Sequence, residues 1–371
     1  MSGRRWDYVI VGSGLFGAVF AQQAIEAGKR VLVVEKRGHI GGNCYSAEHE
    51  DTGIIVHRYG THIFHTPNRA IWDYVNRWSA FTSYRHRVLT QHAGRVYSMP
   101  INLGTINAFF GTTLKPVEVE GFLAARRPVI ERPANLEEKA ISLVGEELYR
   151  AFIAGYTEKQ WGRSPRDLPA SIITRLPVRS SYDDSYFDDR YQGLPVDGYT
   201  PIFERLLTGA DVETGVDFLA DRDHWRARAH RVVYTGPIDA YFGYCHGRLN
   251  WRSVRFETRV LGTADSQGTA VMNYADIDVP YTRIHEPKHL HPERTCRADT
   301  TVVVREYSQV DNDAPYYPVG TPEDNALLER YQALAAEDPR VRMGGRLAQY
   351  KYFDMHHVIA HALKAAREDL A

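Results

Sequence analysis

Cysteine is scarce in this sequence, and metal-binding spacings are missing. The 371 residues include three cysteines, Cys44, Cys245 and Cys296. An odd number of widely spaced cysteines argues against a disulfide framework and fits a reducing compartment. His57, His62 and His65 lie close together in sequence, but no thiolate or carboxylate completes a recognisable zinc motif with them. We therefore expect no metal ion.

Long apolar runs and an excess of charge of one sign are also missing. No stretch approaches the ~18–20 apolar residues of a membrane-spanning helix. The first apolar run is broken at Gly12, which is too early for a signal peptide. The formal net charge is −1, so nothing attracts nucleic acid or an anionic membrane in general. We expect a cytoplasmic protein that meets anionic ligands with a few placed arginines or lysines.

The length and the local patterns indicate an α/β protein of several parts. A chain of 371 residues exceeds the ~250–300 residues of a single hydrophobic core. Residues 100–175 contain helix-compatible stretches followed by a polar aromatic loop that starts at Gly155. Residues 240–310 are rich in Thr, Val, Tyr and Phe, which favours antiparallel strands. Residues 355–370 have apolar side chains at helical spacing.

The strongest local signal is a dinucleotide-binding motif near the N-terminus. Gly12-Ser13-Gly14-Leu15-Phe16-Gly17 is a G-x-G-x-x-G that follows an apolar strand and opens a helix. Gly12 allows the tight turn, Gly14 lets a pyrophosphate approach the backbone, and Gly17 lets the helix pack on the sheet. Glu35 ends the next strand, where it can accept ribose hydroxyls. Strand, helix and acid in register predict a bound dinucleotide.

Two further segments favour FAD over NAD. The segment 35–43, which ends in Gly41-Gly42-Asn43, resembles the second stretch of the glutathione-reductase-like FAD proteins, in which a Gly-Gly pair passes close to the cofactor. Near the C-terminus, Arg346 and then Asp354-Met355 precede a helix, and this resembles the terminal FAD motif of the same proteins. A helix N-terminus facing the flavin favours its anionic reduced form. No motif for covalent flavin attachment is evident, so we expect noncovalent FAD.

A series of further motifs runs in order from about residue 7 to the C-terminus. The segment 59–66, Tyr-Gly-Thr-His-Ile-Phe-His-Thr, resembles the histidine loop of the bacterial UDP-galactopyranose mutases, with Thr61 where proline is expected. The segment 155–162, Gly-Tyr-Thr-Glu-Lys-Gln-Trp-Gly, resembles the mobile substrate loop. The other matching segments are 175–179, 271–274, 279–283, 315–318 and 352–355.

The resemblance implies a fold and a domain division. The fold is a Rossmann-like FAD-binding domain of the glutathione-reductase type with a helical insertion and an antiparallel β-sheet substrate domain. We expect the FAD-binding domain at 1–85, 195–237 and 326–371. We expect the helical domain at 100–175, with a mobile loop at 155–169, and the sheet domain at 86–99, 176–194 and 238–325. Related enzymes are typically dimers, so a homodimer is expected.

The resemblance also implies a reaction. The family interconverts UDP-galactopyranose and UDP-galactofuranose by ring contraction, an isomerisation that supplies galactofuranose for cell-wall polysaccharides and other glycans. It requires reduced FAD, whose N5 attacks the anomeric carbon as UDP leaves. The protein's task is then mainly positioning and electrostatics. This suits a sequence with no evident Ser-His-Asp, Cys-His or paired-carboxylate site.

Individual residues can be assigned to this reaction. The predicted catalytic residues are Arg175 and Arg283, as clamps for the diphosphate, and His65, which the resemblance places at the flavin. Those predicted to bind the cofactor are Gly12, Gly14, Gly17, Glu35, Gly42, Asn43, His62, Arg346, Asp354 and Met355. Those predicted to bind substrate are Phe152, Tyr156 and Trp161 (as aromatic faces for uracil), Thr157, Asn273, and Tyr186, Tyr317 and Tyr352 (through their hydroxyls).

Two alternatives remain open at the level of sequence. A flavin oxidoreductase of the amine-oxidase type shares the fold, but it needs a hydride-donating substrate and no pair of diphosphate arginines. A flavoprotein that binds nucleotide sugars without turning them over is the second alternative. Turnover of UDP-galactofuranose distinguishes the mutase from both.

Overall fold

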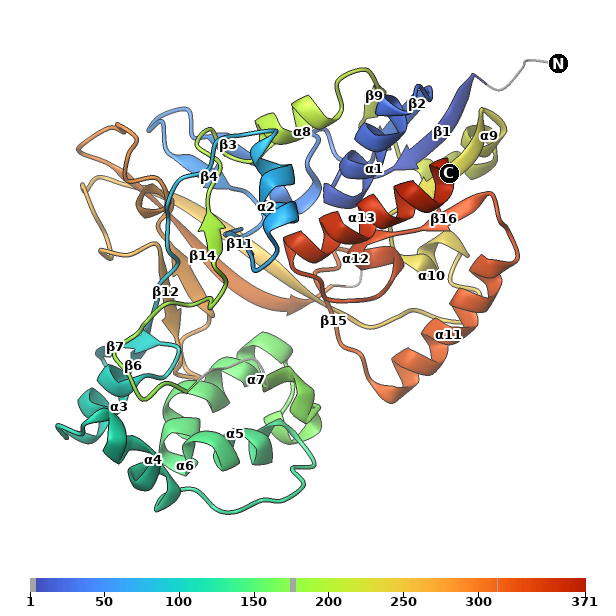
Figure 1. Cartoon of the computed structure of the whole chain (residues 1–371). Helices are drawn as coiled ribbons and strands as arrows, with labels where there is room; N and C mark the ends of the chain where they lie inside the picture. The colour runs from blue at the N-terminus through green and yellow to red at the C-terminus, as the bar shows by residue number, and fades with distance from the viewer. Residues whose placement is uncertain (1–4, 174–177, 312) are drawn as a thin grey trace.

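The computed structural model describes residues 5–173, 178–311 and 313–371, and the fold is that of these residues. Figure 1 shows three regions: a parallel sheet with its helices near both termini, an antiparallel sheet beside it, and a group of helices at the bottom of the view. Both kinds of sheet in one chain, with helices on the parallel one, make this an α/β fold.

The parallel sheet is assembled from distant parts of the chain. Its strand order is β16-β10-β1-β2-β9, and every neighbouring pair is parallel. The central strands are continuous apolar runs because both faces of such a sheet are covered. Its strands are β1 (Trp6–Val11), β2 (Val31–Glu35), β9 (Asp211–Thr214), β10 (Ala229–Tyr234) and β16 (Val341–Met343).

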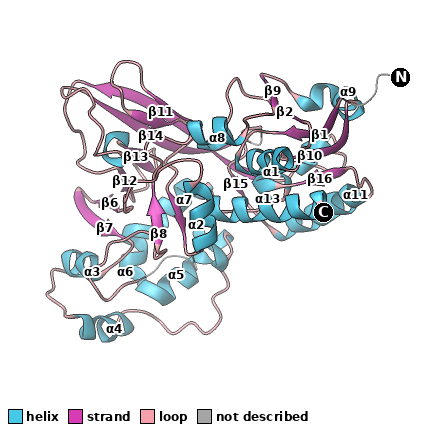
Figure 2. Cartoon of the chain, turned by 45° about the horizontal axis from the view of Figure 1, so that its top comes forward, coloured by secondary structure: helices cyan, strands magenta, loops and turns pink. Residues whose placement is uncertain are grey.

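Two long helices from opposite ends of the chain pack together beside this sheet. They are α1 (Leu15–Glu26) and α13 (Met355–Leu370), which lie side by side in Figures 1 and 2. Both bury alanines completely, such as Ala21 and Ala362, and small side chains let helices approach closely. The other helices of this region are α2 (Arg69–Asn76), α8 (Thr200–Leu206), α9 (Arg222–Ala227), α10 (Ile238–Tyr241), α11 (Pro322–Ala336) and α12 (Gly345–Ala348), with 3₁₀ turns at Gly42–Cys44 and Phe218–Asp221.

The antiparallel sheet has the strand order β15-β11-β14-β13-β12-β6-β7. All its neighbouring strands run antiparallel except β12 and β6, which are parallel. Its strands are β6 (Val88–His92), β7 (Arg95–Met99), β11 (Trp251–Leu261), β12 (Val271–Tyr274), β13 (Arg283–His285), β14 (Thr301–Val310) and β15 (Tyr317–Pro318). A 3₁₀ turn at Pro287–Leu290 and two small sheets complete the strand regions: β3 (Ser46–Glu48) with β4 (Ile55–His57), and β5 (Phe64–Thr66) with β8 (Tyr191–Gly193).

The third region is helical, and Figure 2 shows its helices gathered away from the termini. Asparagine side chains start two of them, because Asn102 accepts the amide of Thr105 and Asn135 accepts the amide of Glu138. The helices are α3 (Leu103–Phe110), α4 (Pro116–Ala124), α5 (Leu136–Val144), α6 (Glu146–Leu148), a π-helical segment (Tyr149–Ala154) and α7 (Gly155–Trp161), with 3₁₀ turns at Pro165–Asp167 and Ala170–Ile173.

One segment of this region differs from the sequence-based expectation. A loop is expected from Gly155, but the structure has a helix from Gly155 to Trp161. This helix ends at Gly162, which adopts the left-handed conformation (φ +62°) typical of a helix terminus. Across the described ranges, no helix combines the length and the apolar character needed to cross a membrane.

Candidate functional site

A cavity of about 860 Å³ opens where the parallel sheet meets the antiparallel one. Its wall includes the glycine loop after β1, the end of β2, the start of α13 and the segment 313–316 before β15. The cavity therefore lies outside the carboxyl ends of parallel strands, the usual ligand position in such sheets. Its volume suits a large cofactor.

The glycines of the predicted motif are required by close contacts. A Cβ atom on Gly12, which has φ +98°, would lie 2.2 Å from Oγ1 of Thr235, and one on Gly17 would lie 2.0 Å from the carbonyl of Gly12. The second glycine stretch packs on the first, because a Cβ on Gly42 would lie 3.0 Å from Cα of Gly14. The two loops together form a backbone surface that a pyrophosphate can approach.

Glu35 lies in the cavity wall at the end of β2, as predicted from the sequence. One of its carboxylate oxygens accepts the amide and the hydroxyl of Ser13, at 2.8 and 2.7 Å. The other accepts the amide of Arg37 at 2.9 Å. A carboxylate oxygen has two lone pairs, so Glu35 both orders the glycine loop and retains capacity for ribose hydroxyls. Asn43 also lines the cavity and accepts a hydrogen bond from Arg37.

Arg346 supplies a cation with a buried, unsatisfied donor at the same cavity. Its Nη2 donates to the carbonyl of Tyr316 at 2.7 Å, and its guanidinium lies 4.8 Å from the ring centre of Tyr352. Its Nε is buried and has no hydrogen-bond partner in the part of the chain that the structure describes. A buried unpaired donor is costly, so this atom fits a polar ligand in the cavity. Met355 lines the cavity nearby.

The two histidines of the histidine loop occupy different positions. His62 lines the cavity, and its Nδ1 carries the proton because it lies 2.7 Å from the carbonyl of Gly60. Burial lowers the pKa of His62 to about 4, so the ring is neutral at pH 7. His65, which was assigned to the flavin, is not among the described residues that line the cavity. Its ring stacks on Phe187 at 3.7 Å, and its Nδ1 lies 2.5 Å from Asp189.

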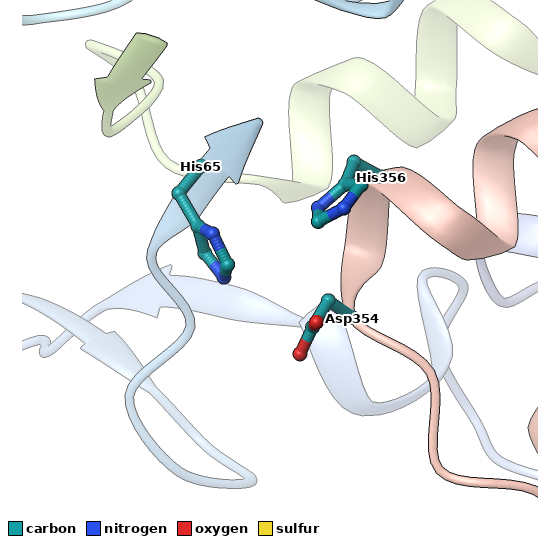
Figure 3. Close-up of side chains that lie close together, drawn as sticks. All are labelled: His65, Asp354 and His356. Atoms are coloured by element: carbon teal, nitrogen blue, oxygen red, sulfur yellow. The ribbon is translucent and has the colours of Figure 1, made fainter. Parts of the chain in front are cut away.

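His65 lies in a cluster with Asp354 and His356, shown in Figure 3, and its role at the flavin stays a prediction. Each of the three offers one ligand atom, and these atoms lie within 4.8 Å of one another. Nδ1 of His356 is buried and unpaired among the described residues, whereas Asp354 also lies 3.4 Å from His357. The expected absence of a metal ion remains a prediction that a chelation experiment must test.

A second group with metal-like spacing already has its hydrogen bonds. Asp265, Glu286 and His289 also bring their ligand atoms within 4.8 Å of one another. The fully buried carboxylate of Glu286 accepts the amides of residues 266 and 267 and the hydroxyl of Thr301. These donors satisfy the charge of Glu286 without an ion.

Five of the predicted site residues form a tyrosine–arginine cluster next to the cavity. Nη2 of Arg283 donates to the hydroxyl of Tyr156, and the rings of Tyr317 and Tyr352 lie 5.8 Å apart. Arg283 also interacts electrostatically with Tyr186 and Tyr317. Burial raises the pKa of Tyr156 to about 12, so its hydroxyl keeps the proton. Tyr352 joins this cluster to Arg346 and therefore to the cavity.

Strand register places a row of polar residues across the antiparallel sheet. Asn273 of β12 pairs with Arg283 of β13, which pairs in turn with Glu306 of β14. Paired residues on neighbouring strands have side chains on the same face. Oδ1 of Asn273 is buried without a hydrogen-bond partner within the described ranges, so it is available to a ligand.

From this row, a buried network of hydrogen bonds and ion pairs connects Arg283 to the histidine loop. Nε of Arg283 lies 3.4 Å from Oε1 of Glu306, and Oε2 of Glu306 lies 3.1 Å from Nε2 of His285. Nδ1 of His285 is 2.8 Å from the hydroxyl of Thr61. Burial raises the pKa of Glu306, but Arg283 and His285 outweigh burial and hold it at about 2. The carboxylate is therefore charged and fixes the arginine.

The remaining predicted substrate residues have less open positions. Phe152 is 4% exposed and packs edge-on against Tyr97 and Phe109, and its contact with uracil stays a prediction. Thr157 is buried, and Trp161 is half-buried against the main core. Arg175 lies outside the described residues.

Sequence reasoning missed Glu306 and His285. No motif surrounds either residue, and in the sequence Glu306 is one of several polar residues that follow the apolar run Val302–Val304. It also missed Lys159, although that residue lies within the segment 155–162 that resembles the substrate loop. Thr61 stands where the family pattern has proline, but its hydrogen bond to His285 joins residues 224 positions apart and is not visible in the sequence.

Known proteins resemble this chain over nearly its whole length. The profile of the UDP-galactopyranose mutase family matches residues 151–352, and that of the NAD(P)-binding Rossmann-like domain matches residues 10–78. The chain is 44% identical to a probable UDP-galactopyranose mutase of Klebsiella pneumoniae over 98% of this chain and 95% of that one. It is 40% identical to the dTDP-fucopyranose mutase of Escherichia coli over 97% of both chains.

More distant relatives share the whole fold. The UDP-galactopyranose mutase of Mycoplasma pneumoniae is 30% identical over 98% of this chain and 96% of its own. The crystal structure of a reduced UDP-galactopyranose mutase superposes with a TM-score of 0.76 over 98% of this chain and 95% of that one, at 16% identity. The predicted fold class, a Rossmann-like domain combined with an antiparallel sheet, is confirmed. This chain is a flavin-dependent isomerase that belongs to the UDP-galactopyranose mutase family.

Proposed function

We propose that this protein interconverts UDP-galactopyranose and UDP-galactofuranose with reduced, noncovalently bound FAD. The observation that carries the proposal is the contact between Arg346 and Tyr352. Through it, a cavity suited to a dinucleotide borders a cluster of tyrosines around a fixed arginine. A cofactor and a nucleotide sugar bound at these two places are neighbours.

The residues of the cavity suit FAD. The paired glycine loops suit its pyrophosphate and Glu35 its ribose, while Nε of Arg346 offers a donor at the other end of the wall. The N-terminus of α13 and Arg346 both favour negative charge. When bound and reduced, FAD supplies a nucleophilic N5 for the anomeric carbon.

The chain's own residues bind and orient the substrate. Arg283, held by Glu306 on one side and Tyr156 on the other, meets the diphosphate and stabilises the charge that builds up as UDP leaves. The hydroxyls of Tyr186, Tyr317 and Tyr352 add donors for phosphate oxygens. Asn273 offers its unpaired Oδ1 to the uridine. His62 is neutral at pH 7 and therefore adds no charge at the cofactor.

The proposal includes a setting for the enzyme. We place it in the cytoplasm as a homodimer that provides galactofuranose units for cell-wall polysaccharides and related glycans. The cysteines support a reducing compartment, since all three, Cys44, Cys245 and Cys296, are unpaired.

A second substrate pair has specific support. The relative from Escherichia coli, 40% identical over almost the full length, is named a dTDP-fucopyranose mutase. dTDP-fucopyranose carries the same diphosphate but differs from UDP-galactopyranose in the base, the ribose and the sugar. Arg283 and the tyrosines serve both substrates, so only measurement with each one separates them.

The decisive experiment compares oxidised and dithionite-reduced protein. Each is incubated with UDP-galactofuranose or with dTDP-fucofuranose, and the pyranose forms are separated by chromatography. We expect conversion of UDP-galactofuranose by the reduced protein alone. Equal rates in both redox states would exclude N5 attack, and no conversion of either sugar would favour a flavoprotein that only binds nucleotide sugars.

A further inference from the structure

Lys159 forms a set of hydrogen bonds that joins α7 to the antiparallel sheet. Its Nζ lies within hydrogen-bond distance of four backbone carbonyls, those of Tyr274 (2.8 Å), Asp276 (2.7 Å), Val279 (3.0 Å) and Tyr281 (3.2 Å). Tyr274 is the last residue of β12, and the other three belong to the connection between β12 and β13. An ammonium has three N–H donors, so the carbonyls share them and together surround the charge.

The C-terminal end of α7 is held by a second cation, which is buried. Nε of Arg252, a 6% exposed residue of β11, donates to the carbonyl of Gln160 at 3.0 Å, and its Nη2 donates to Ser308 at 2.8 Å. The last carbonyls of a helix lack partners within the helix and carry partial negative charge. Arg252 therefore satisfies and neutralises this end of α7.

The N-terminal end of α7 packs closely against the connection between β12 and β13. A Cβ atom on Gly155 would lie 2.6 Å from the carbonyl of Ala275 and 3.1 Å from the amide of Ile277. Only glycine allows this approach. The β12–β13 connection thus contacts α7 at Gly155 and again at Lys159.

The charge of Lys159 persists at neutral pH. Burial lowers the pKa of Lys159 to about 8, although Asp276 and Asp278 oppose this effect. The ammonium form therefore predominates at pH 7, and the carbonyls face a full charge.

We propose that Lys159, together with Arg252 and Gly155, holds α7 as a fixed wall of the substrate site. Tyr156 and Trp161, which α7 carries, are then in place before the nucleotide sugar binds, and α7 is not part of a lid. Lys159 acts as a positioning residue, since it contacts backbone and no reacting atom. The inference rests on the proposed function in one respect, the assignment of these aromatic residues to the nucleotide.

Hydrogen–deuterium exchange on the FAD-loaded protein tests the position of α7 directly. We expect the amides of α7 to be protected before UDP is added and to change little afterwards. Lys159→Met removes the donors and keeps an unbranched side chain. It should speed exchange in α7 and weaken UDP binding by about 10-fold, because several charge-assisted bonds are lost. Lys364→Met, at an exposed lysine of α13, is the matched control.

A conservative variant and a kinetic comparison separate positioning from a general structural role. Lys159→Arg keeps the charge and should restore part of the UDP affinity. In Lys159→Met, KM for the nucleotide sugar should rise more than kcat falls, with unchanged FAD content. If Lys159→Met loses FAD or fails to fold, Gly155→Ala, which displaces the other end of α7, must show the same faster exchange.

Two results would overturn the inference. One is an α7 that exchanges freely in the parent protein and becomes protected only with UDP, which is the behaviour of a lid. The other is parental exchange and parental UDP affinity in both Lys159→Met and Gly155→Ala. A parent protein that neither binds UDP nor converts the sugar contradicts the proposed function instead, and leaves the exchange result to decide whether α7 is fixed.

Discussion

Replacing Glu306 by glutamine tests the charged network behind the tyrosine–arginine cluster. The substitution keeps the shape of the side chain and removes its charge. Arg283 then loses the carboxylate 3.4 Å from its Nε, and His285 loses the one 3.1 Å from its Nε2. We expect slower turnover because the arginine is no longer held in one orientation, and lower stability because a largely buried guanidinium loses its counter-charge.

The magnitude follows from the proton affinity of the carboxylate. Burial raises the pKa of Glu306, but Arg283 and His285 bring it to about 2, below the ordinary 4.5. At about 1.4 kcal/mol per tenfold change in proton affinity, this lowering stabilises the folded state by about 3 kcal/mol. A carboxyl group whose pKa is lower in the folded than in the unfolded state stabilises the fold at pH values above its unfolded-state pKa. The contribution of Glu306 is therefore complete above pH 4.5 and is lost as the pH falls toward 2.

The assay measures turnover of the reduced enzyme, bound FAD and the melting temperature between pH 3 and pH 8. Glu306→Gln should melt at a lower temperature than the parent at pH 7, by an amount that shrinks as the pH falls below 4.5. Turnover should drop about 10-fold or more with FAD retained. Glu329→Gln, on the exposed face of α11, is the control. Parental turnover together with a parental melting temperature at pH 7 would refute the role of Glu306.

Three further outcomes are expected. Arg283→Ala should lower turnover by ~30- to 1,000-fold with unchanged FAD content. Arg283→Lys should recover only part of the lost turnover, since lysine lacks the bidentate fork of arginine. Near-parental initial rates in both variants would show that Arg283 does not bind the diphosphate. Acid precipitation should release the flavin into the supernatant, whereas flavin in the pellet would mean a covalent link. Dialysis against EDTA should leave turnover unchanged, and a loss reversed by added zinc would instead assign a metal to the cluster of His65, Asp354 and His356.

The cofactor half of the site was predictable because its chemistry is local. A turn that passes a phosphate needs glycines at fixed spacing, and the acid that meets the ribose ends the next strand. Gly12, Gly17 and Glu35 accordingly have the predicted positions, and the close contacts explain why each glycine is needed. Such requirements are satisfied within about 30 residues and can therefore be read in sequence.

The helix α7 was not predictable from local propensity. Gly155, Thr157 and Trp161 are weak helix formers, so a loop was the natural expectation. The helix is stabilised by Lys159, through carbonyls more than 100 residues away. Tertiary contacts of this kind override local preference.

The polar row across the antiparallel sheet was hidden for a related reason. Asn273, Arg283 and Glu306 become neighbours only through the register of three antiparallel strands. Glu306 alone looks like a solvent-facing residue of a strand. The burial of Phe152 was hidden in the same way, because it packs against Tyr97 and Phe109 from other parts of the chain.

The strand order of the parallel sheet has a consequence for how the protein is made. Synthesis runs from the N-terminus, so β1, β2 and the glycine loop leave the ribosome first. Their neighbours β10 and β16 and the covering helix α13 follow about 200 to 350 residues later. Until then the buried alanines of α1 have no helix α13 to cover them, and Arg346 and Met355 are missing from the cavity wall. The cavity wall is therefore complete only after α13 has been translated, so under the proposed function a chain that ends before α13 should retain no flavin.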